Sequence, residues 1–156
     1  MPSEIRFNDP VAIESISRAT SVPFKPQYDQ CIARFSDDGV PLGGLFLTDY
    51  NVVSVQVHVA GLQKGWIDRA LLWVAFDYPF RCLNIRKLIA LVRQTNTPSL
   101  EFCAHMGFNV ETRVTDVFPD GDMIVLGLYK DQCRFLKMRP PRITFGGIRG
   151  EKCTSA

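Results

Sequence analysis

The sequence predicts one α/β domain, of the α+β kind, in which strands form a sheet and helices cover it. A chain of 156 residues with 46% hydrophobic and 22% charged residues is enough for one domain with a buried core. Apolar residues recur near the 3.6-residue period over residues 66–78, which predicts a helix with one face inward. Residues 88–92 are a short apolar run, typical of a strand covered on both faces. Residues 52–59 alternate between valine and polar residues, which predicts a strand with two unlike faces.

The N-terminal third is expected to supply a strand, a short helix and a hairpin. Residues 4–7 predict a first edge strand, and the Asp-Pro pair that follows predicts the start of a helix. Residues 19–29 contain two prolines and no clear period, so they are expected to form a loop. Two strand-like runs, 30–35 and 44–48, flank a segment of hairpin-loop composition and predict a hairpin.

The C-terminal half is expected to supply a second helix and a second hairpin. Pro79 is expected to end the helix over residues 66–78. The Asn-Thr-Pro-Ser segment at 96–99 predicts a turn and a helix start, and Gly107 can take the left-handed conformation that ends a helix. Residues 109–118 and 123–129 flank a Pro-Asp-Gly-Asp turn, which predicts the hairpin.

Composition limits the function classes. The formal net charge of +2 is too small to imply a polyanionic partner for the whole domain. The five cysteines are widely spaced without a C-x-x-C pair, so reduced, mostly buried thiols and no metal site are expected. No apolar run approaches 18 residues, and the N-terminus lacks the layout of a signal peptide. A cytoplasmic protein without a membrane partner is therefore expected.

The C-terminal segment differs in composition from the rest of the chain. Residues 1–133 are expected to form the domain, and residues 134–156 a basic, Gly- and Pro-containing tail. Phe135 and Phe145 are the only aromatic residues of this tail, which is few for a nucleic-acid contact. A solvated arm, or a contact with another copy of the chain in an assembly, is the better interpretation.

Residues 65–108 run in the order glycine turn, amphipathic helix, buried strand, Asn-x-x-Ser, short helix and Gly-Phe. This order resembles the cofactor half of the GCN5-related N-acetyltransferases, the GNAT superfamily. The turn is most similar to that of the subgroup that acetylates ribosomal-protein N-termini, which reads Gly-Tyr-Ala-x-Glu-Ala. The residues that carry the resemblance are Gly65, Trp66, Ile67, Asp68, Arg69, Ala70, Asn96, Ser99, Gly107 and Phe108.

The resemblance implies a mixed, mostly antiparallel sheet of six to seven strands flanked by helices, and acetyl-CoA as cofactor. The turn before the helix would hold the diphosphate, because free N–H groups and the helix dipole favour anions. The strand over residues 52–59 would lie beside the pantetheine. The implied cofactor-binding residues are Val57, Val59, Gln63, Lys64, Gly65, Trp66, Ile67, Asp68, Arg69, Asn96 and Ser99.

The cofactor loop departs from the pattern of the family. Ile67 stands at the second small position, and Asp68 brings a carboxylate close to where the phosphates would lie. Lys64 and Arg69 offset this charge. Trp66 has two interpretations, stacking on the adenine of a cofactor or packing against the sheet, and packing is the more common role.

Acyl transfer to an amine needs a base for the amine and an acid for the leaving thiolate. His58 and Gln56 lie on the polar face of the alternating strand, where the family often places a base or a water-holding residue. Cys103 stands seven residues after Asn96, where many family members have a tyrosine acid. The structural alternatives are a hydrogen-bonded histidine and a packed cysteine.

The sequence thus leads to two hypotheses. The first is an acyl-CoA-dependent N-acyltransferase that moves an acetyl group by direct attack of a primary amine, which would be a small amine, a protein N-terminus or a lysine. The alternative is a catalytically inactive binding or structural protein of the same fold, virus-encoded and virion-associated. The degenerate cofactor loop favours the alternative.

Overall fold

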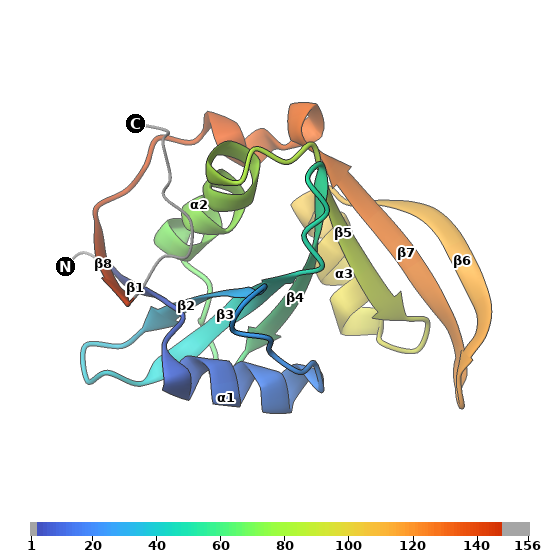
Figure 1. The fold of residues 1–156 in the computed structure, drawn as a ribbon, viewed down its shortest axis with the longest axis horizontal. Helices are drawn as coiled ribbons and strands as arrows, with labels where there is room; N and C mark the ends of the chain where they lie inside the picture. Colours follow the sequence, from blue (N-terminus) through green and yellow to red (C-terminus); the bar gives the residue numbers. More distant parts are fainter. Residues whose placement is uncertain (1–2, 148–156) are drawn as a thin grey trace.

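A computed structural model describes residues 3–147. The chain forms one eight-stranded sheet in the order β6-β7-β5-β4-β3-β2-β1-β8 (Figure 1). The β4–β5 and β1–β8 pairs are parallel and the other pairs are antiparallel, which confirms the mixed, mostly antiparallel sheet. The strands are β1 Ser3–Phe7, β2 Gln30–Phe35, β3 Pro41–Thr48, β4 Ser54–Gly61, β5 Lys87–Arg93, β6 Asn109–Phe118, β7 Gly121–Tyr129 and β8 Ile143–Gly147.

The eighth strand comes from the segment 134–156, which the sequence sets apart as a tail. β8 pairs with β1 over five residues, so β1 is not the edge strand that the sequence predicts. Earlier in this segment, Phe135 is buried and stacks on Phe76 of α2, with 4.7 Å between ring centroids. Residues 148–156 lie outside the described residues.

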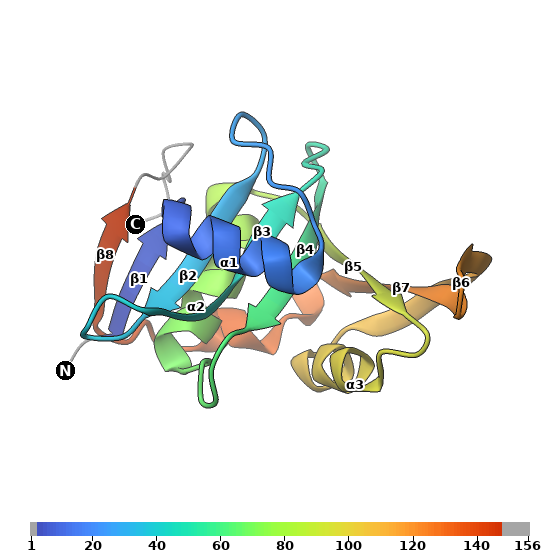
Figure 2. The same ribbon diagram turned by 90° about the horizontal axis from the view of Figure 1, so that it is seen from below.

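The helices cover both faces of the sheet (Figure 2). α1 (Pro10–Thr20) buries Ala12 and Ile16 in one core cluster, together with Phe46 of β3. α2 (Arg69–Asp77) and α3 (Thr97–Met106) contribute to the larger cluster on the opposite face. The short helical turns are η1 Tyr78–Cys82, η2 Lys130–Gln132 and η3 Arg134–Lys137.

Pro79 does not end the helical path as the sequence predicts. The chain continues from α2 into a π-helical turn, Tyr78–Cys82, in which the N–H of Leu83 donates to the carbonyl of Tyr78 at 3.0 Å. A proline is tolerated at the first positions of a helical segment, where its missing N–H is not needed. By contrast, α3 begins at an Asn96 cap and ends at Gly107 with φ 101°, as predicted.

The two central strands separate after a short contact. β4 and β5 pair only at Ser54–Lys87, Val55–Leu88 and Gln56–Ile89. Beyond this point β4 stays paired with β3, while β5 stays paired with β7. Leu91 is 37% exposed, so the prediction that β5 is covered on both faces is wrong along its diverging end. The separation leaves an opening in the middle of the sheet.

The cysteines differ from the uniform set of reduced thiols expected from the sequence. Cys31, Cys103 and Cys133 are buried free thiols, whereas Cys82 is disulfide-bonded. The expectation is therefore wrong for Cys82, and Cys153 lies outside the described residues. Within residues 3–147 no helix combines the length and the apolar character needed to cross a bilayer.

Candidate active site

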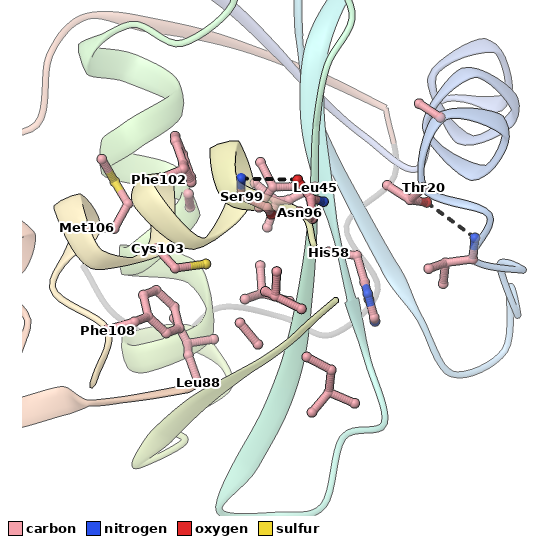
Figure 3. A pocket seen from close by; sticks show the side chains of 18 of the residues that line it. Thr20, Leu45, His58, Leu88, Asn96, Ser99, Phe102, Cys103, Met106 and Phe108 are labelled. Atoms are coloured by element: carbon pink, nitrogen blue, oxygen red, sulfur yellow. Dashed lines mark hydrogen bonds between the residues drawn. The ribbon is translucent and has the colours of Figure 1, made fainter. Parts of the chain in front are cut away.

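A cavity of about 440 Å³ occupies the opening between β4 and β5. It reaches both faces of the sheet, because its lining residues come from the end of α1 on one side and from α2 and α3 on the other. Figure 3 shows His58 on the side of Thr20, and Phe102, Cys103 and Met106 on the opposite side of the strands. The opening therefore gives two separate groups of side chains access to one space.

His58 is the ionisable base candidate in this cavity. Its Nε2 lies 3.0 Å from Oγ1 of Thr48, which in turn donates to Oδ2 of Asp49 at 2.9 Å. Burial lowers the pKa of His58 below its usual 6.5, and the charges of Asp49 and Asp29 partly oppose this shift. A lowered pKa keeps the imidazole neutral at neutral pH, which is the form a base needs.

Cys103 lies on the other side of the opening, on the buried face of α3. Burial raises the pKa of its thiol to about 11. The thiol is therefore protonated at neutral pH, so it can donate a proton but is not a nucleophile. Its buried position also fits the structural role in packing, beside Met106 and Phe108.

The candidate residues of β4 differ in whether they line the cavity. Val57 and Val59 line the cavity, and their contact with pantetheine stays a prediction. Gln56 lies at the last paired position, opposite Thr48 on β3 and Ile89 on β5. It lies on the same face of β4 as His58, two residues away, but it is not part of the cavity wall.

The N-terminus of α2 is capped by the chain itself. Asp68 Oδ1 accepts from the N–H of Leu71 at 2.8 Å, and Oδ2 pairs with Nε of Arg34 at 3.0 Å and accepts from the hydroxyl of Ser3. The guanidinium of Arg34 also donates to the carbonyls of Gly65 and Trp66 at 2.9 and 3.0 Å. A carboxylate of the protein thus lies where the helix would attract a phosphate.

Trp66 packs against the ends of β3 and β4. A Cβ atom at Gly61 would lie 2.3 Å from Nε1 of Trp66, and one at Gly43 would lie 2.6 Å from its ring. The indole also contacts Phe102 of α3, with 5.9 Å between ring centroids. The packing interpretation of Trp66 therefore describes its position, and the ring forms part of the cavity wall together with Ile67.

The other residues of the implied cofactor loop lie outside the cavity wall. Gln63, Lys64, Gly65 and Arg69 are all exposed. The N–H of Gln63 donates to the carbonyl of Leu42, as does that of Leu62, both at 3.0 Å. These contacts hold the loop to the start of β3.

Asn96 and Ser99 lie at the start of α3, and both line the cavity. The side chain of Asn96 accepts from the N–H of Ser99 at 3.3 Å and so acts as the N-cap of the helix. This local role explains the Asn-x-x-Ser spacing without a cofactor.

Two functional candidates, Thr48 and Arg34, are absent from the residues that the sequence predicts. Thr48 was predictable in principle, since a hairpin between residues 44–48 and 52–59 brings its strand end beside His58. Arg34 meets Asp68 across more than 30 residues of sequence, and no local pattern marks that contact.

Separated central strands, one helix on one face and two on the other define the fold of the GCN5-related N-acetyltransferases. Among solved structures, the chain is similar to spermidine N-acetyltransferase from Vibrio cholerae in complex with CoA and spermine, with a TM-score of 0.66 and 15% identity over 82% of this chain and 95% of that one. A dodecameric structure of the same enzyme gives a TM-score of 0.67 and 16% identity over 85% and 95% of the two chains.

A chimera of the Vibrio cholerae enzyme SpeG with hSSAT is also similar, with a TM-score of 0.70 and 15% identity over 88% of this chain and all of the other. Identities this low establish the fold and not the activity. No family model matches the sequence, and no curated protein matches it. The resemblance to the ribosomal-protein subgroup stays a prediction.

Proposed function

We propose that the chain binds an acyl-CoA thioester in the cavity between β4 and β5 and transfers the acyl group, acetyl in the simplest case, to a primary amine. The observation that carries this proposal is the separation of the two parallel strands after Gln56 and Ile89. Beyond that point, alternate backbone N–H and C=O groups of both strands face the opening. Such groups need partners, and the two amides of a pantetheine arm are suited to them.

The side chains around the opening support the reaction. An ammonium acceptor would give its proton to His58, and the free amine would attack the thioester carbon. The C–N bond would form, the C–S bond would break, and the new amide nitrogen would lose its second proton to solvent. The thiolate would take a proton from solvent or from Cys103, which solvent would then reprotonate. His58 and Cys103 line the cavity from opposite faces, as a donor and an acceptor that approach from opposite faces require.

The acceptor is proposed to be a cationic amine: a small polyamine-like molecule, a protein N-terminus or a lysine. Asp29 and Asp49 are the charged groups that act on His58, and both attract a cation toward its side of the sheet. The similar enzymes from Vibrio cholerae are spermidine N-acetyltransferases, which supports this class. Self-association through residues 134–156, and a cytoplasmic location, remain proposals.

A specific observation favours a second function, a binding or structural module without catalysis. Asp68 caps α2 and is paired with Arg34, and Trp66 packs over the glycines at the strand ends. A diphosphate at this turn would have to displace the Asp68 carboxylate or lie beside it at a cost in Coulomb energy. If that cost exceeds the gain in the pantetheine slot, no acyl-CoA binds.

Calorimetric titration with acetyl-CoA tests the two functions against each other. Val59 is 38% exposed and lines the cavity, so Val59→Trp fills the slot without disturbing the core. Val117, on β6, is 41% exposed and does not line the cavity, so it is the matched control for the same substitution. The transferase predicts saturable binding that falls at least about tenfold in Val59→Trp and is unchanged in Val117→Trp, with acetylated amine detected by mass spectrometry. No binding at millimolar acetyl-CoA would establish the module.

A further inference from the structure

Thr48 connects a carboxylate to the candidate base. Thr48 is the last residue of β3 and is 4% exposed, and Asp49 follows it with a positive φ of 53°. Oγ1 of Thr48 lies 2.9 Å from Oδ2 of Asp49 and 3.0 Å from Nε2 of His58. The hydroxyl therefore has two partners on opposite sides, and both hydrogen bonds have good lengths.

Counting protons fixes the direction of both hydrogen bonds. A hydroxyl has one proton, and an ionised carboxylate can only accept. The proton of Thr48 therefore goes to Asp49, and Oγ1 has only lone pairs left for His58. Nε2 of His58 must then be the donor to Oγ1, and a neutral imidazole has no second proton for Nδ1.

We infer that Thr48 and Asp49 are positioning residues that hold His58 as its Nε2–H tautomer, so that Nδ1 receives the proton of the acceptor ammonium. This inference rests on the proposed transferase function, because only a base needs a defined free nitrogen. Among residues 3–147, Nδ1 of His58 has no hydrogen-bond partner. Nδ1 is also not among the fully buried side-chain atoms that lack a partner, so it is accessible. Nδ1 is thus free to accept a proton, and His58 lines the cavity.

The surrounding charges suit this role. The groups that act on His58 are Asp49, through Thr48, and Asp29, which precedes β2. Asp29 accepts from the N–H of Lys25 at 2.8 Å, and burial raises its own pKa. Burial keeps His58 neutral before reaction, while the two carboxylates stabilise the imidazolium that forms when it takes a proton.

The proposed step balances without a further reactant. The first N–H bond of the ammonium breaks and its proton moves to Nδ1, the amine nitrogen bonds to the thioester carbon, and the C–S bond then breaks. The new amide nitrogen gives its second proton to solvent, and the thiolate takes a proton from Cys103 or from solvent. The resulting imidazolium still donates Nε2–H to Thr48. Its new proton leaves from Nδ1 to solvent, which restores the starting tautomer.

The tautomer can be measured directly in the free protein by long-range ¹H–¹⁵N correlation of the two histidine side chains. The chain has only His58 and His105, so His105 is an internal control in every spectrum. At a pH where His58 is neutral, the wild type is expected to show His58 with the proton on Nε2. Thr48→Val, which removes the hydroxyl but keeps the shape, should shift the population toward Nδ1–H. Thr48→Ser, which keeps the hydroxyl, should retain the wild-type tautomer.

Two results of this tautomer measurement would overturn the inference. One is an Nδ1–H imidazole in the wild type, which stays informative even if the valine variant fails to fold. The other is an unchanged Nε2–H population in Thr48→Val that gives a native spectrum elsewhere, including at His105.

Kinetics add a second readout that a merely structural role would not move. In Thr48→Val, kcat is expected to fall by about tenfold or more with KM for acetyl-CoA unchanged. Asp49→Asn should move the acid limb of the pH–rate profile to lower pH, because a carboxylate that raises the pKa of His58 is lost. If the wild type is active but neither variant changes the pH–rate profile, the positioning role is rejected and the proposed function stands. A wild type that binds no acetyl-CoA rejects the proposed function, while the tautomer measurement still decides the geometry.

Discussion

Asp68 offers the sharpest separation of stability from ligand binding in this chain. Its carboxylate has three contacts: Oδ1 caps α2 at the N–H of Leu71, and Oδ2 pairs with Arg34 and accepts from the hydroxyl of Ser3. Asp68→Ser keeps a capping oxygen and removes the charge, whereas Asp68→Ala removes both. If the carboxylate competes with a diphosphate at this helix end, both substitutions should tighten acetyl-CoA binding by the same factor.

The expected magnitudes differ for the two properties. A phosphate charge about 6 Å from the carboxylate, at an effective dielectric of about 40–80, is destabilised by roughly 0.7–1.4 kcal/mol, or about three- to tenfold in Kd. Loss of a cap costs about 1 kcal/mol of stability, which lowers Tm by roughly 2–4 °C in a domain of this size. The partly exposed ion pair with Arg34 adds only about 0–1 kcal/mol, equally in both variants.

Calorimetric titration at two salt concentrations, with thermal unfolding of each variant, measures both effects. The serine and alanine variants should bind acetyl-CoA alike, differ by the cap in Tm, and lose part of their advantage at high salt because charges are screened. Affinity that is unchanged or weaker in both variants would refute competition, and would mean that the diphosphate lies elsewhere or gains nothing from this turn.

Three further predictions concern the cavity wall and its titrating groups. Gly61→Ala should lower the free energy of unfolding by about 1–3 kcal/mol in urea unfolding, because the new methyl group overlaps Trp66. A variant as stable as the wild type would mean that the indole has another place to pack. Burial lowers the pKa of His58 in the folded state, so the unfolded state binds more protons below about pH 6.5. The free energy of unfolding should therefore fall as the pH drops from about 6.5. Unfolding curves collected across this pH range should show a flatter dependence in His58→Gln. Cys103, with a pKa of about 11, should resist iodoacetamide in the native protein at pH 7 and react only after unfolding. Peptide mass spectrometry measures the extent of labelling. Rapid labelling of the native protein would contradict the burial of Cys103.

The elements that the sequence predicts well have local signals. The cap at Asn96 and the left-handed Gly107 bound α3 within ten residues, and the pattern of residues 52–59 matches β4. These features depend on neighbours in the chain, so one sequence is enough to find them. The resemblance of residues 65–108 then led to the correct fold because it joins several such signals in order.

The features that sequence reasoning missed depend on contacts between distant segments. β8 pairs in parallel with β1 from the other end of the chain, and a five-residue run ending in two glycines has little strand pattern of its own. The pairing of Arg34 with Asp68 likewise joins β2 to the start of α2. Asp68 was expected to repel phosphates, but its role as a cap held by an arginine needed the structure.

The separation of β4 from β5 and the capped turn before α2 act on different parts of a CoA thioester, and this allows one last prediction. In the proposed complex the strand edges would face the pantetheine arm, whereas Asp68 would act on the negatively charged diphosphate. Acetyl-pantetheine, which lacks that diphosphate and the 3′-phosphorylated adenosine attached to it, should therefore bind the wild type within about tenfold of acetyl-CoA, because the charged half contributes little when a carboxylate opposes it. Asp68→Ser should tighten the binding of acetyl-CoA and leave the binding of acetyl-pantetheine unchanged, so that the difference between the two affinities grows. Titration of both ligands into both proteins gives the coupling between the carboxylate and the diphosphate as a difference of differences. An equal gain in affinity for both ligands would show that the substitution changes the shape of the slot instead of removing a repulsion.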